Sequence, residues 1–454
     1  MRLGGIAVFA VALAACGFWV GVSADSPPSS SQSMAIAYTS TPQYAAAAWL
    51  QGGERFPAGA RIMIRDGGVD RLLVSGFTAT ADPSISFDGA RILFAGKREA
   101  KDSWQVWEVA VAGGEAKRIT ACDGDCVRPF YLPGGKLAYA RQSNHRYLLE
   151  TAGLEGGVVT QLTYALGNVL PTDVLRDGRI LFEAAYPLGS GTSPEIYTVY
   201  SDGSGVESYR CDHGPSRQAG RQVTSGDVVF SKSDGLSRFT SALAHDVDMT
   251  APAGEFAGDV VETPTHEYLV SWRPDSKAPY ALQIWNPRSN SVQPLVALHD
   301  ASIVQPVLIG ARPVPNQHPS GLHDWNYANL LCLNTYTSKY TFAAGAITSM
   351  RLYTKSEAGK TKLLGGSRIE PDGSFYVRVP ADQPLQIELL GRDGKPLKRE
   401  QGWFWMRQGE QRICVGCHSG PERAPENAVP AVLVKSTTPV DLTGSGTPTY
   451  KGGR

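Results

Sequence analysis

Short runs of alternating apolar and polar residues recur in a fixed order along the first two thirds of the chain. Each unit opens with a glycine turn that leads into an alternating strand, at residues 85–94, 130–139 and 174–182, with a degraded copy at 224–230. Side chains that alternate with a period of two are typical of half-buried strands. The Asp-Gly and Gly-Gly pairs supply the left-handed turn that a tight hairpin needs. The pattern therefore predicts repeated β-hairpins rather than helices.

The spacing of this repeat predicts the architecture. A second alternating strand, another Gly-rich turn and a short strand complete each unit, so that four short strands recur about every 45 residues. Such a period is typical of β-propeller blades. We expect a propeller over residues 41–305 with five or six blades, six being preferred; a generic antiparallel sandwich is the alternative.

The composition changes at residues 306–324, which read as a Pro-rich linker. Beyond it, residues 325–430 return to strand alternation with hairpin turns between the runs, and no helical period of useful length appears. The predicted fold class is therefore all-β, a propeller of about six blades followed by a small β-sandwich-like domain. Residues 431–454 are expected to form a C-terminal tail.

Residues 1–24 have the pattern of an export signal, with an apolar stretch too short to span a bilayer as a helix. The stretch ends in Leu-Ala-Ala-Cys, which is similar to the lipobox of bacterial lipoproteins, so Cys16 is a candidate for lipidation. Ordinary cleavage after Ala24 and an uncleaved anchor are the alternatives. The Ser/Pro-rich residues 25–40 are predicted to be a flexible tether. All three alternatives place the folded part on the periplasmic or extracellular side, and a lipidated cysteine followed by glycine favours the outer membrane.

Length and charge narrow the possible partners. A chain of 454 residues favours two folded units rather than one core. Its 43 basic and 43 acidic residues balance, with no long run of Lys or Arg, which argues against a nucleic-acid partner. No second segment approaches the length of about 18 apolar residues that a membrane helix requires. The expected membrane contact is therefore the N-terminal lipid alone.

Seven cysteines fit an oxidising compartment. Cys16 belongs to the signal and two others belong to a C-terminal motif, which leaves Cys122, Cys126, Cys211 and Cys332. Four cysteines allow three pairings, and sequence alone does not choose among them. A bridge between Cys122 and Cys126 around the short Asp-Gly-Asp loop is favoured; reduced thiols are the alternative.

The sequence Cys414-Val-Gly-Cys417-His418 carries the most specific chemical signal. Two thiols separated by two residues can add across the two vinyl groups of a haem, and the next histidine then falls beneath the iron. We therefore expect one c-type haem, bound covalently by Cys414 and Cys417 with His418 as an axial ligand. A surface disulfide and half of a zinc site are the alternatives, although a closed zinc site needs more ligands than this motif supplies.

The sixth iron ligand stays open at this point. Met406 lies close to the motif in sequence, and His318 and His323 flank the start of the second domain. An open or water-bound iron is the further alternative. The aromatic residues 403–405 are expected to pack on the porphyrin or, equally, within a strand core. No catalytic triad, phosphate loop or paired catalytic carboxylates rises above background.

Two family resemblances follow from these motifs. Residues 82–94, Asp-Pro-Ser-Ile-Ser-Phe-Asp-Gly-Ala-Arg-Ile-Leu-Phe, are similar to the blade motif of TolB-type propellers. The order of propeller, β domain and Cys-x-x-Cys-His resembles the hydrazine synthase alpha subunit and its relatives, most clearly from residue 371 through the motif to Pro425-Glu426-Asn427. The first resemblance implies a fold, and the second implies a haem-bearing domain.

The chain differs from the hydrazine synthase alpha family in the features that determine the chemistry of that family. The hydrazine-forming enzyme has a second haem domain and a tyrosine just after the motif that ligates the active-site iron. This chain has one such motif, followed by Ser419-Gly420-Pro421-Glu422 with no tyrosine in reach. We therefore expect an exported c-type cytochrome that acts as an electron-transfer or haem-bearing redox subunit, with a propeller that docks a redox partner protein. The alternatives are a hydrazine synthase alpha-like enzyme acting on a small nitrogen or oxygen species, and a lipid-anchored scaffold with structural haem; the oligomeric state is not fixed.

Overall fold

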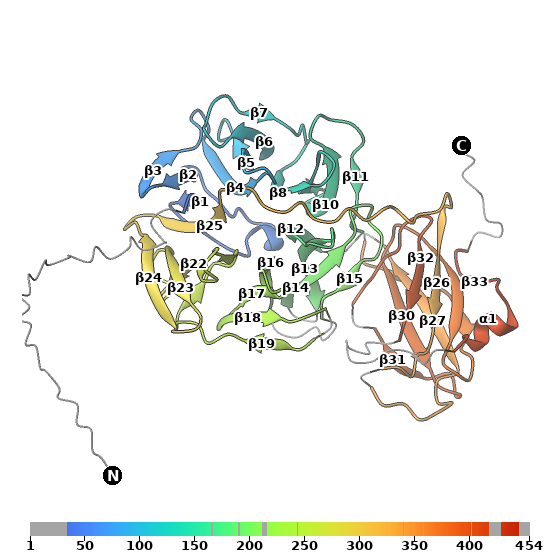
Figure 1. Cartoon of the computed structure of the whole chain (residues 1–454). Helices are drawn as coiled ribbons and strands as arrows, with labels where there is room; N and C mark the ends of the chain where they lie inside the picture. Colours follow the sequence, from blue (N-terminus) through green and yellow to red (C-terminus); the bar gives the residue numbers. More distant parts are fainter. Residues whose placement is uncertain are drawn as a thin grey trace, which may run out of the picture.

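The computed structural model contains a ring of sheets joined to a smaller two-sheet domain (Figure 1). The structure describes residues 34–164, 167–188, 191–210, 216–242, 244–338, 340–356, 358–400, 402–416 and 428–444. Among these residues no helix is long and apolar enough to cross a membrane. The predicted signal segment, including Cys16, lies outside the described residues.

Six sheets form the propeller, which confirms the preferred blade number. Blades 2 to 5 each take four consecutive strands, in the order β4-β5-β6-β7, β8-β9-β10-β11, β12-β13-β14-β15 and β16-β17-β18-β19. The strands of blades 2 and 3 are β4 (Ala79–Ile85), β5 (Arg91–Lys97), β6 (Gln105–Ala110), β7 (Lys117–Arg118), β8 (Cys126–Leu132), β9 (Lys136–Ser143), β10 (Arg146–Gly153) and β11 (Thr160–Gln161). Those of blades 4 and 5 are β12 (Asn168–Val174), β13 (Ile180–Leu188), β14 (Gly191–Val199), β15 (Glu207–Ser208), β16 (Gln218–Gln222), β17 (Val228–Lys232), β18 (Gly235–Phe239) and β19 (Asp246–Asp248).

The ring closes by joining the two ends of the propeller in one sheet. Blade 6 contains β20 (Glu255–Phe256), β21 (Val261–Glu262), β22 (Tyr268–Arg273), β23 (Ala281–Asn286) and β24 (Ser291–Val296). Blade 1 contains β25 (Ser302–Leu308), β1 (Ile36–Thr41), β2 (Arg61–Asp66) and β3 (Val69–Leu72), with β25 paired to β1. The propeller therefore extends beyond the expected 41–305 at both ends. Residues 36–40, expected in the tether, are part of a strand because β25 needs them as its partner.

The segment between β1 and β2 plugs one end of the ring. It carries a 3-10 turn (Trp49–Gln51), and Trp49, Leu50 and Phe56 are buried against inner residues of several blades. Buried charges sit beside this plug: both Arg128 amino groups bond the Asp259 carboxylate at 3.0 and 2.9 Å. The centre of the propeller is therefore filled by side chains.

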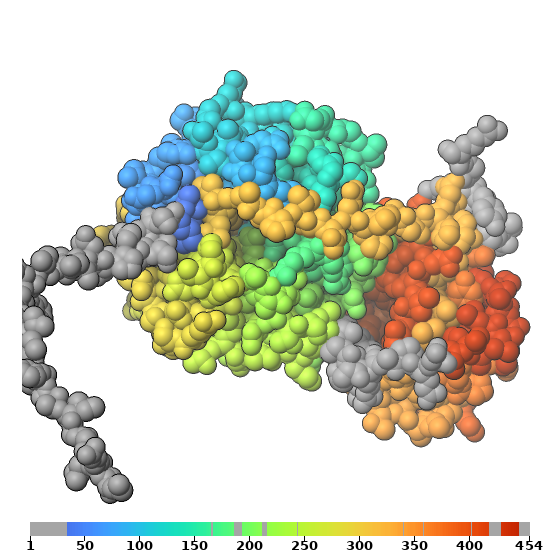
Figure 2. Space-filling view, in the orientation of Figure 1, coloured from blue at the N-terminus to red at the C-terminus, as the bar shows by residue number. Residues whose placement is uncertain are grey.

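The linker runs across the propeller surface, as Figure 2 shows by the band between the blades and the second domain. It contacts the very turns that define the repeat. Gly89 and Gly178 have φ of 75° and 87°, and a Cβ at Gly89 would lie 2.6 Å from the carbonyl carbon of Gly310. A Cβ at Gly178 would lie 2.1 Å from the carbonyl oxygen of Asn316. Glycine is therefore required there both for the turn and for the linker.

The second domain is a β-sandwich, as expected. One sheet has the order β32-β26-β29-β33 and the other β28-β27-β30-β31. Their strands are β26 (Tyr327–Cys332), β27 (Ser349–Lys355), β28 (Thr361–Arg368), β29 (Phe375–Pro380), β30 (Leu385–Leu390), β31 (Pro396–Arg399), β32 (Gln411–Cys414) and β33 (Val440–Asp441). Inward residues of both sheets form one apolar core.

Part of the expected tail belongs to this sandwich. The described chain resumes at residue 428 with a short helix, α1 (Ala431–Lys435), and β33 then pairs in parallel with β29. Leu442 is buried in the sandwich core. Residues 431–442 are therefore structured because they complete the edge of the first sheet.

Candidate haem-attachment site

A cavity of about 500 Å³ lies between blade 4 and the inner face of the sandwich. The propeller wall consists of Arg179, Tyr197, Tyr200 and residues 205–208, and the sandwich wall consists of Leu330, Cys332, Thr335, Phe375, Ile387, Leu389, Lys398, Glu400, residues 402–404 and residues 412–416. Most of these side chains are apolar or aromatic. The volume falls in the range of clefts that enclose small molecules and cofactors.

Cys414 carries its thiol on the wall of this cavity. It ends β32, which pairs in parallel with β26 and places Cys414 beside Cys332. Burial raises the pKa of the Cys414 thiol. The thiol therefore lies among mostly apolar and aromatic side chains.

The rest of the motif is only partly visible. Cys417 and His418 lie outside the described residues, so the structure does not place the second thiol or the axial imidazole. Gly416 lines the cavity, and a Cβ at this position would lie 2.1 Å from the carbonyl oxygen of Thr337. The glycine inside the motif is therefore required by close packing, a constraint that the spacing alone did not reveal.

The four residues 403–406 enter three different environments. Trp403 and Phe404 line the cavity, which places them where a porphyrin would need apolar cover. Trp405 is buried in the core shared by blades 3 and 4, and its Nε1 donates to the carbonyl oxygen of Leu162 at 3.1 Å. Met406 is fully buried in the sandwich core and does not line the cavity. The Met406 side chain packs in the sandwich core, and its suggested role as a sixth ligand stays a prediction.

The two histidines suggested as ligands also lie off the cavity wall. His318, in the linker, lies against Tyr200 with ring centroids 4.3 Å apart and the rings tilted by 33°; Tyr200 lines the cavity and His318 does not. His323 is exposed and stacks on Trp325 at 4.3 Å. Among the cavity-lining residues that the structure describes, none is His or Met. The described wall residues with side-chain atoms able to bind a metal are tyrosine, glutamate and cysteine.

The two walls are held together by polar contacts next to the cavity. Arg407 pairs with Asp382 at 2.8 Å and also bonds the Tyr164 hydroxyl of the propeller. The backbone N–H of Gly205 donates to the Glu410 carboxylate at 3.1 Å. The propeller is therefore a fixed wall of the site. Sequence reasoning missed blade 4 because strand alternation marks Tyr197 as a strand residue without indicating which blade the sandwich covers.

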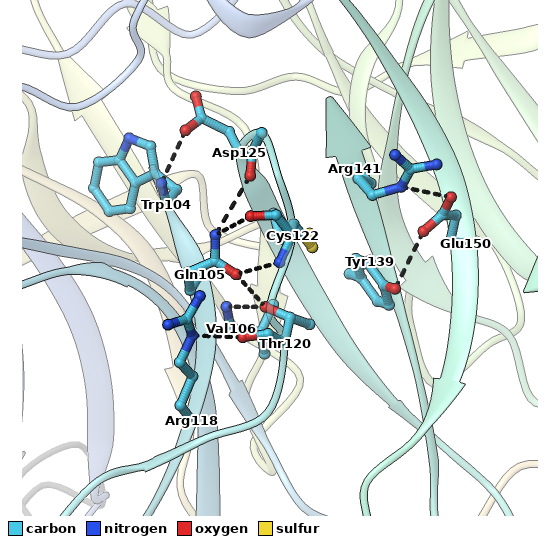
Figure 3. Close-up of a disulfide and its surroundings, with 12 residues drawn as sticks. Trp104, Gln105, Val106, Arg118, Thr120, Cys122, Asp125, Tyr139, Arg141 and Glu150 are labelled. Carbon is cyan, nitrogen blue, oxygen red and sulfur yellow. Dashed lines mark hydrogen bonds and ion pairs between the residues drawn. A yellow bond between two sulfur atoms is a disulfide. The ribbon is translucent and has the colours of Figure 1, made fainter. Parts of the chain in front are cut away.

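The favoured disulfide is present, far from this cavity in the fold. Cys122 and Cys126 are bonded, with Cα atoms 6.3 Å apart, in the loop that leads from blade 2 into blade 3. Figure 3 shows how the Gln105 side chain holds this loop: its Oε1 accepts from the Cys122 N–H at 2.9 Å and its Nε2 donates to the Cys122 carbonyl at 3.1 Å. Cys211 lies outside the described residues, so a second bridge stays a prediction.

Comparison with known proteins agrees with the sequence motifs. The family model for the hydrazine synthase alpha subunit middle domain matches residues 334–419, a range that contains the whole Cys-x-x-Cys-His motif. The predicted resemblance to the hydrazine synthase alpha-like family is confirmed. Hydrazine synthase subunit alpha of Kuenenia stuttgartiensis is 29% identical over 105 residues, which are 22% of this chain and 13% of that protein.

Solved structures extend the likeness to the propeller. Hydrazine synthase of Kuenenia stuttgartiensis covers 89% of this chain and matches it over 72% of its own, with a TM-score of 0.75 and 17% identity. TolB from Acinetobacter baumannii matches 61% of this chain and 66% of its own at 14% identity, with a TM-score of 0.45. The hydrazine synthase likeness establishes a shared arrangement of propeller and β domain. The sequence match spans 13% of the length of hydrazine synthase subunit alpha, so it does not establish the activity of this chain.

Proposed function

We propose that this chain is an exported c-type haem protein that acts as a haem-bearing redox subunit. The observation that carries the proposal is the position of Cys414 on the wall of an apolar cavity between two domains. Cys414 and Cys417 would hold the haem through thioether bonds, and His418 would bind its iron. The haem would supply one-electron transfer, tuned by its axial ligands and by burial.

The residues around the thiol have the roles such a group demands. Trp403, Phe404, Phe375 and Leu389 line the cavity and would exclude water from a porphyrin. Trp405 and Arg407 tie the sandwich to the propeller beside it. A fixed, apolar enclosure limits reorganisation when charge changes, which suits electron exchange with a redox partner protein.

The test is covalent haem content. The full chain should be produced in an exported form in cells that mature c-type cytochromes, and its intact mass measured after acid–acetone extraction. We expect the added mass of one haem, lost in Cys414→Ala and Cys417→Ala. Cys332→Ala is the matched control, because Cys332 neighbours Cys414 in the sheet and lines the same cavity. A mature protein without haem, with Cys414 joined to Cys417, would refute the proposal.

Export and anchoring form part of the same proposal. The disulfide between Cys122 and Cys126 supports an oxidising compartment, because such bonds are rare in the cytosol. We propose lipidation at Cys16 as the membrane anchor. Replacement of Cys16 with Ser should release the mature protein from the membrane fraction while the haem content is unchanged; retention in the membrane fraction would contradict lipidation.

A second candidate function is catalysis on a small nitrogen or oxygen species. It is favoured by the absence of His and Met among the described cavity-lining residues, since an iron without a strong sixth ligand can bind small molecules. This candidate predicts a high-spin spectrum and rapid CO or NO binding. A low-spin spectrum that CO does not change would exclude it and leave electron transfer.

A further inference from the structure

The charged residues on the cavity wall are not equivalent. Arg179 pairs with Asp177 at 2.8 Å and approaches Glu207 at 3.7 Å. Arg412 pairs with Glu410 at 2.7 Å. Lys398 forms no ion pair with any carboxylate in the part of the chain that the structure describes. It is therefore the cavity-lining cation that still has charge to offer a ligand.

Lys398 faces inward from the edge of a sheet. It lies on β31 directly opposite Leu389 of β30, and Leu389 belongs to the apolar core of the sandwich. The Lys398 side chain is half-buried, with its Nζ 4.0 Å from the centroid of the Tyr340 ring. A cation beside apolar side chains is costly unless an anion or an aromatic face compensates it. Its position at the rim between core and solvent suits the carboxylate end of an otherwise apolar ligand.

We infer that Lys398 binds a propionate carboxylate of the haem, an inference that rests on the haem proposed above. The porphyrin is largely apolar, and its two propionates are the anionic groups that must meet a cation or water when it is enclosed. A lysine ammonium provides a compact charge and three donors for such a carboxylate. Lys398 is thus a positioning residue that orients the haem and sets the charge beside it.

The competing explanation is structural. β31 lies at the edge of its sheet, and inward-pointing charges on edge strands prevent one sheet from pairing with another. In that case Lys398 would act on association and not on the haem. The two explanations differ in one measurable property, the pH at which a propionate releases its proton.

The experiment measures the midpoint potential of the haem-loaded full chain against pH. A nearby cation lowers the pKa of a carboxylate, so Lys398→Gln should raise the pH of the propionate inflection by about one unit and lower the potential above it. Lys398→Arg should restore both properties. Lys395→Gln is the matched control, because Lys395 lies at the start of the same hairpin arm but is exposed and paired with Asp393 at 3.3 Å.

A second variant keeps the test decisive if Lys398→Gln does not fold. Lys398→Met keeps the length of the side chain and removes its charge, so it should raise the inflection in the same way. The other charged wall groups are Arg179, Glu207, Glu400 and Arg412, and they stay constant in both variants. An inflection unchanged in the variants that fold would overturn the role of Lys398 while the haem stays in place. A wild-type protein without haem would instead overturn the proposed function and this inference together.

Discussion

The centre of the propeller and the cavity beside the sandwich differ in how their charged side chains are paired. At the centre, Arg128 bonds Asp259 with two amino groups, and Arg221 adds a third contact at 2.9 Å. On the cavity wall, the Thr335 hydroxyl is buried without a hydrogen-bond partner and Lys398 has no carboxylate among the described residues. Buried polar groups are normally satisfied. The described charges at the centre are therefore paired within the protein, although Arg55 Nε and Trp104 Nε1 there lack a hydrogen-bond partner among the described residues just as the Thr335 hydroxyl does. What distinguishes the cavity wall is a cation, Lys398, without a carboxylate among the described residues.

The largest expected effect tests the pairing of buried charges at the centre of the propeller. Arg128→Met leaves the Asp259 charge buried with Arg221 as its remaining close cation, and we expect the free energy of unfolding to fall by about 3 to 5 kcal/mol in urea titrations. Replacing Arg128 and Asp259 together with Met and Leu should recover part of that loss, because the Asp259 charge is removed while the buried Asp82 carboxylate, 3.8 Å from Arg128, still loses its cation. A double variant less stable than Arg128→Met would contradict this account.

The next effect tests the junction between the two regions. Trp405→Phe removes the donor to the Leu162 carbonyl, and an unpaired buried acceptor should destabilise the chain by about 1 to 3 kcal/mol. A weaker contact between the sandwich and the propeller should also make cleavage of the linker faster in limited proteolysis. Trp325→Phe is the control, since that ring stacks between His323 and Tyr327 away from the propeller core. Equal protease sensitivity in both variants would argue against Trp405 as the tie.

The third prediction concerns acid. Burial alone would raise the pKa of Asp259, but the guanidinium groups of Arg128 and Arg221 hold it below its usual range. A carboxyl with a depressed folded-state pKa contributes stability above its unfolded value of about 3.9, and this contribution is lost as the pH falls below that value. Asp259→Asn should therefore lower stability at neutral pH and flatten its decline below about pH 4. If the free energy of unfolding of Asp259→Asn, measured in urea titrations, declined below about pH 4 as steeply as that of the unchanged protein, this prediction would be refuted.

The smallest effect tests the buried Thr335 hydroxyl on the cavity wall. Thr335→Val removes a buried hydroxyl that has no hydrogen-bond partner among the described residues, so stability without ligand should change by less than about 1 kcal/mol and can even rise. Thr163→Val is the matched control: its hydroxyl accepts from the Leu149 N–H at 2.9 Å, and its loss should cost about 1 kcal/mol or more. Equal losses would show that the Thr335 hydroxyl is satisfied within the protein.

The architecture was predictable from sequence because it repeats. The turn at Asp88-Gly89 and the strand after it recur in register, so blade number and strand order followed from local pattern. The sandwich followed from alternation in the same way. Pairing between strands far apart in sequence could not be predicted from local pattern. Most of β1 was therefore assigned to the tether, because its partner β25 lies at the far end of the propeller.

The candidate site was predictable only where chemistry is local. Cys414 was identified by spacing, and the structure places it on a cavity wall. The opposite wall was not identified, because it depends on contacts between residues far apart in sequence, such as Gly205 and Glu410. The neighbouring residues 403–406 divide among the cavity wall, the propeller core and the sandwich core, a division that strand alternation cannot specify.

Closure of the first blade has a consequence for how the molecule is made. The Thr39 hydroxyl bonds the Gln305 side chain across 266 positions of sequence, so the ring cannot shut until almost the whole propeller is available. Contacts between residues so far apart in sequence form slowly, because the chain loses the entropy of loop closure before the contacts stabilise it. The Cys414 segment is synthesised later still, and its cavity needs blade 4 already folded. We therefore expect the cavity itself to form late in folding, after the propeller ring has closed.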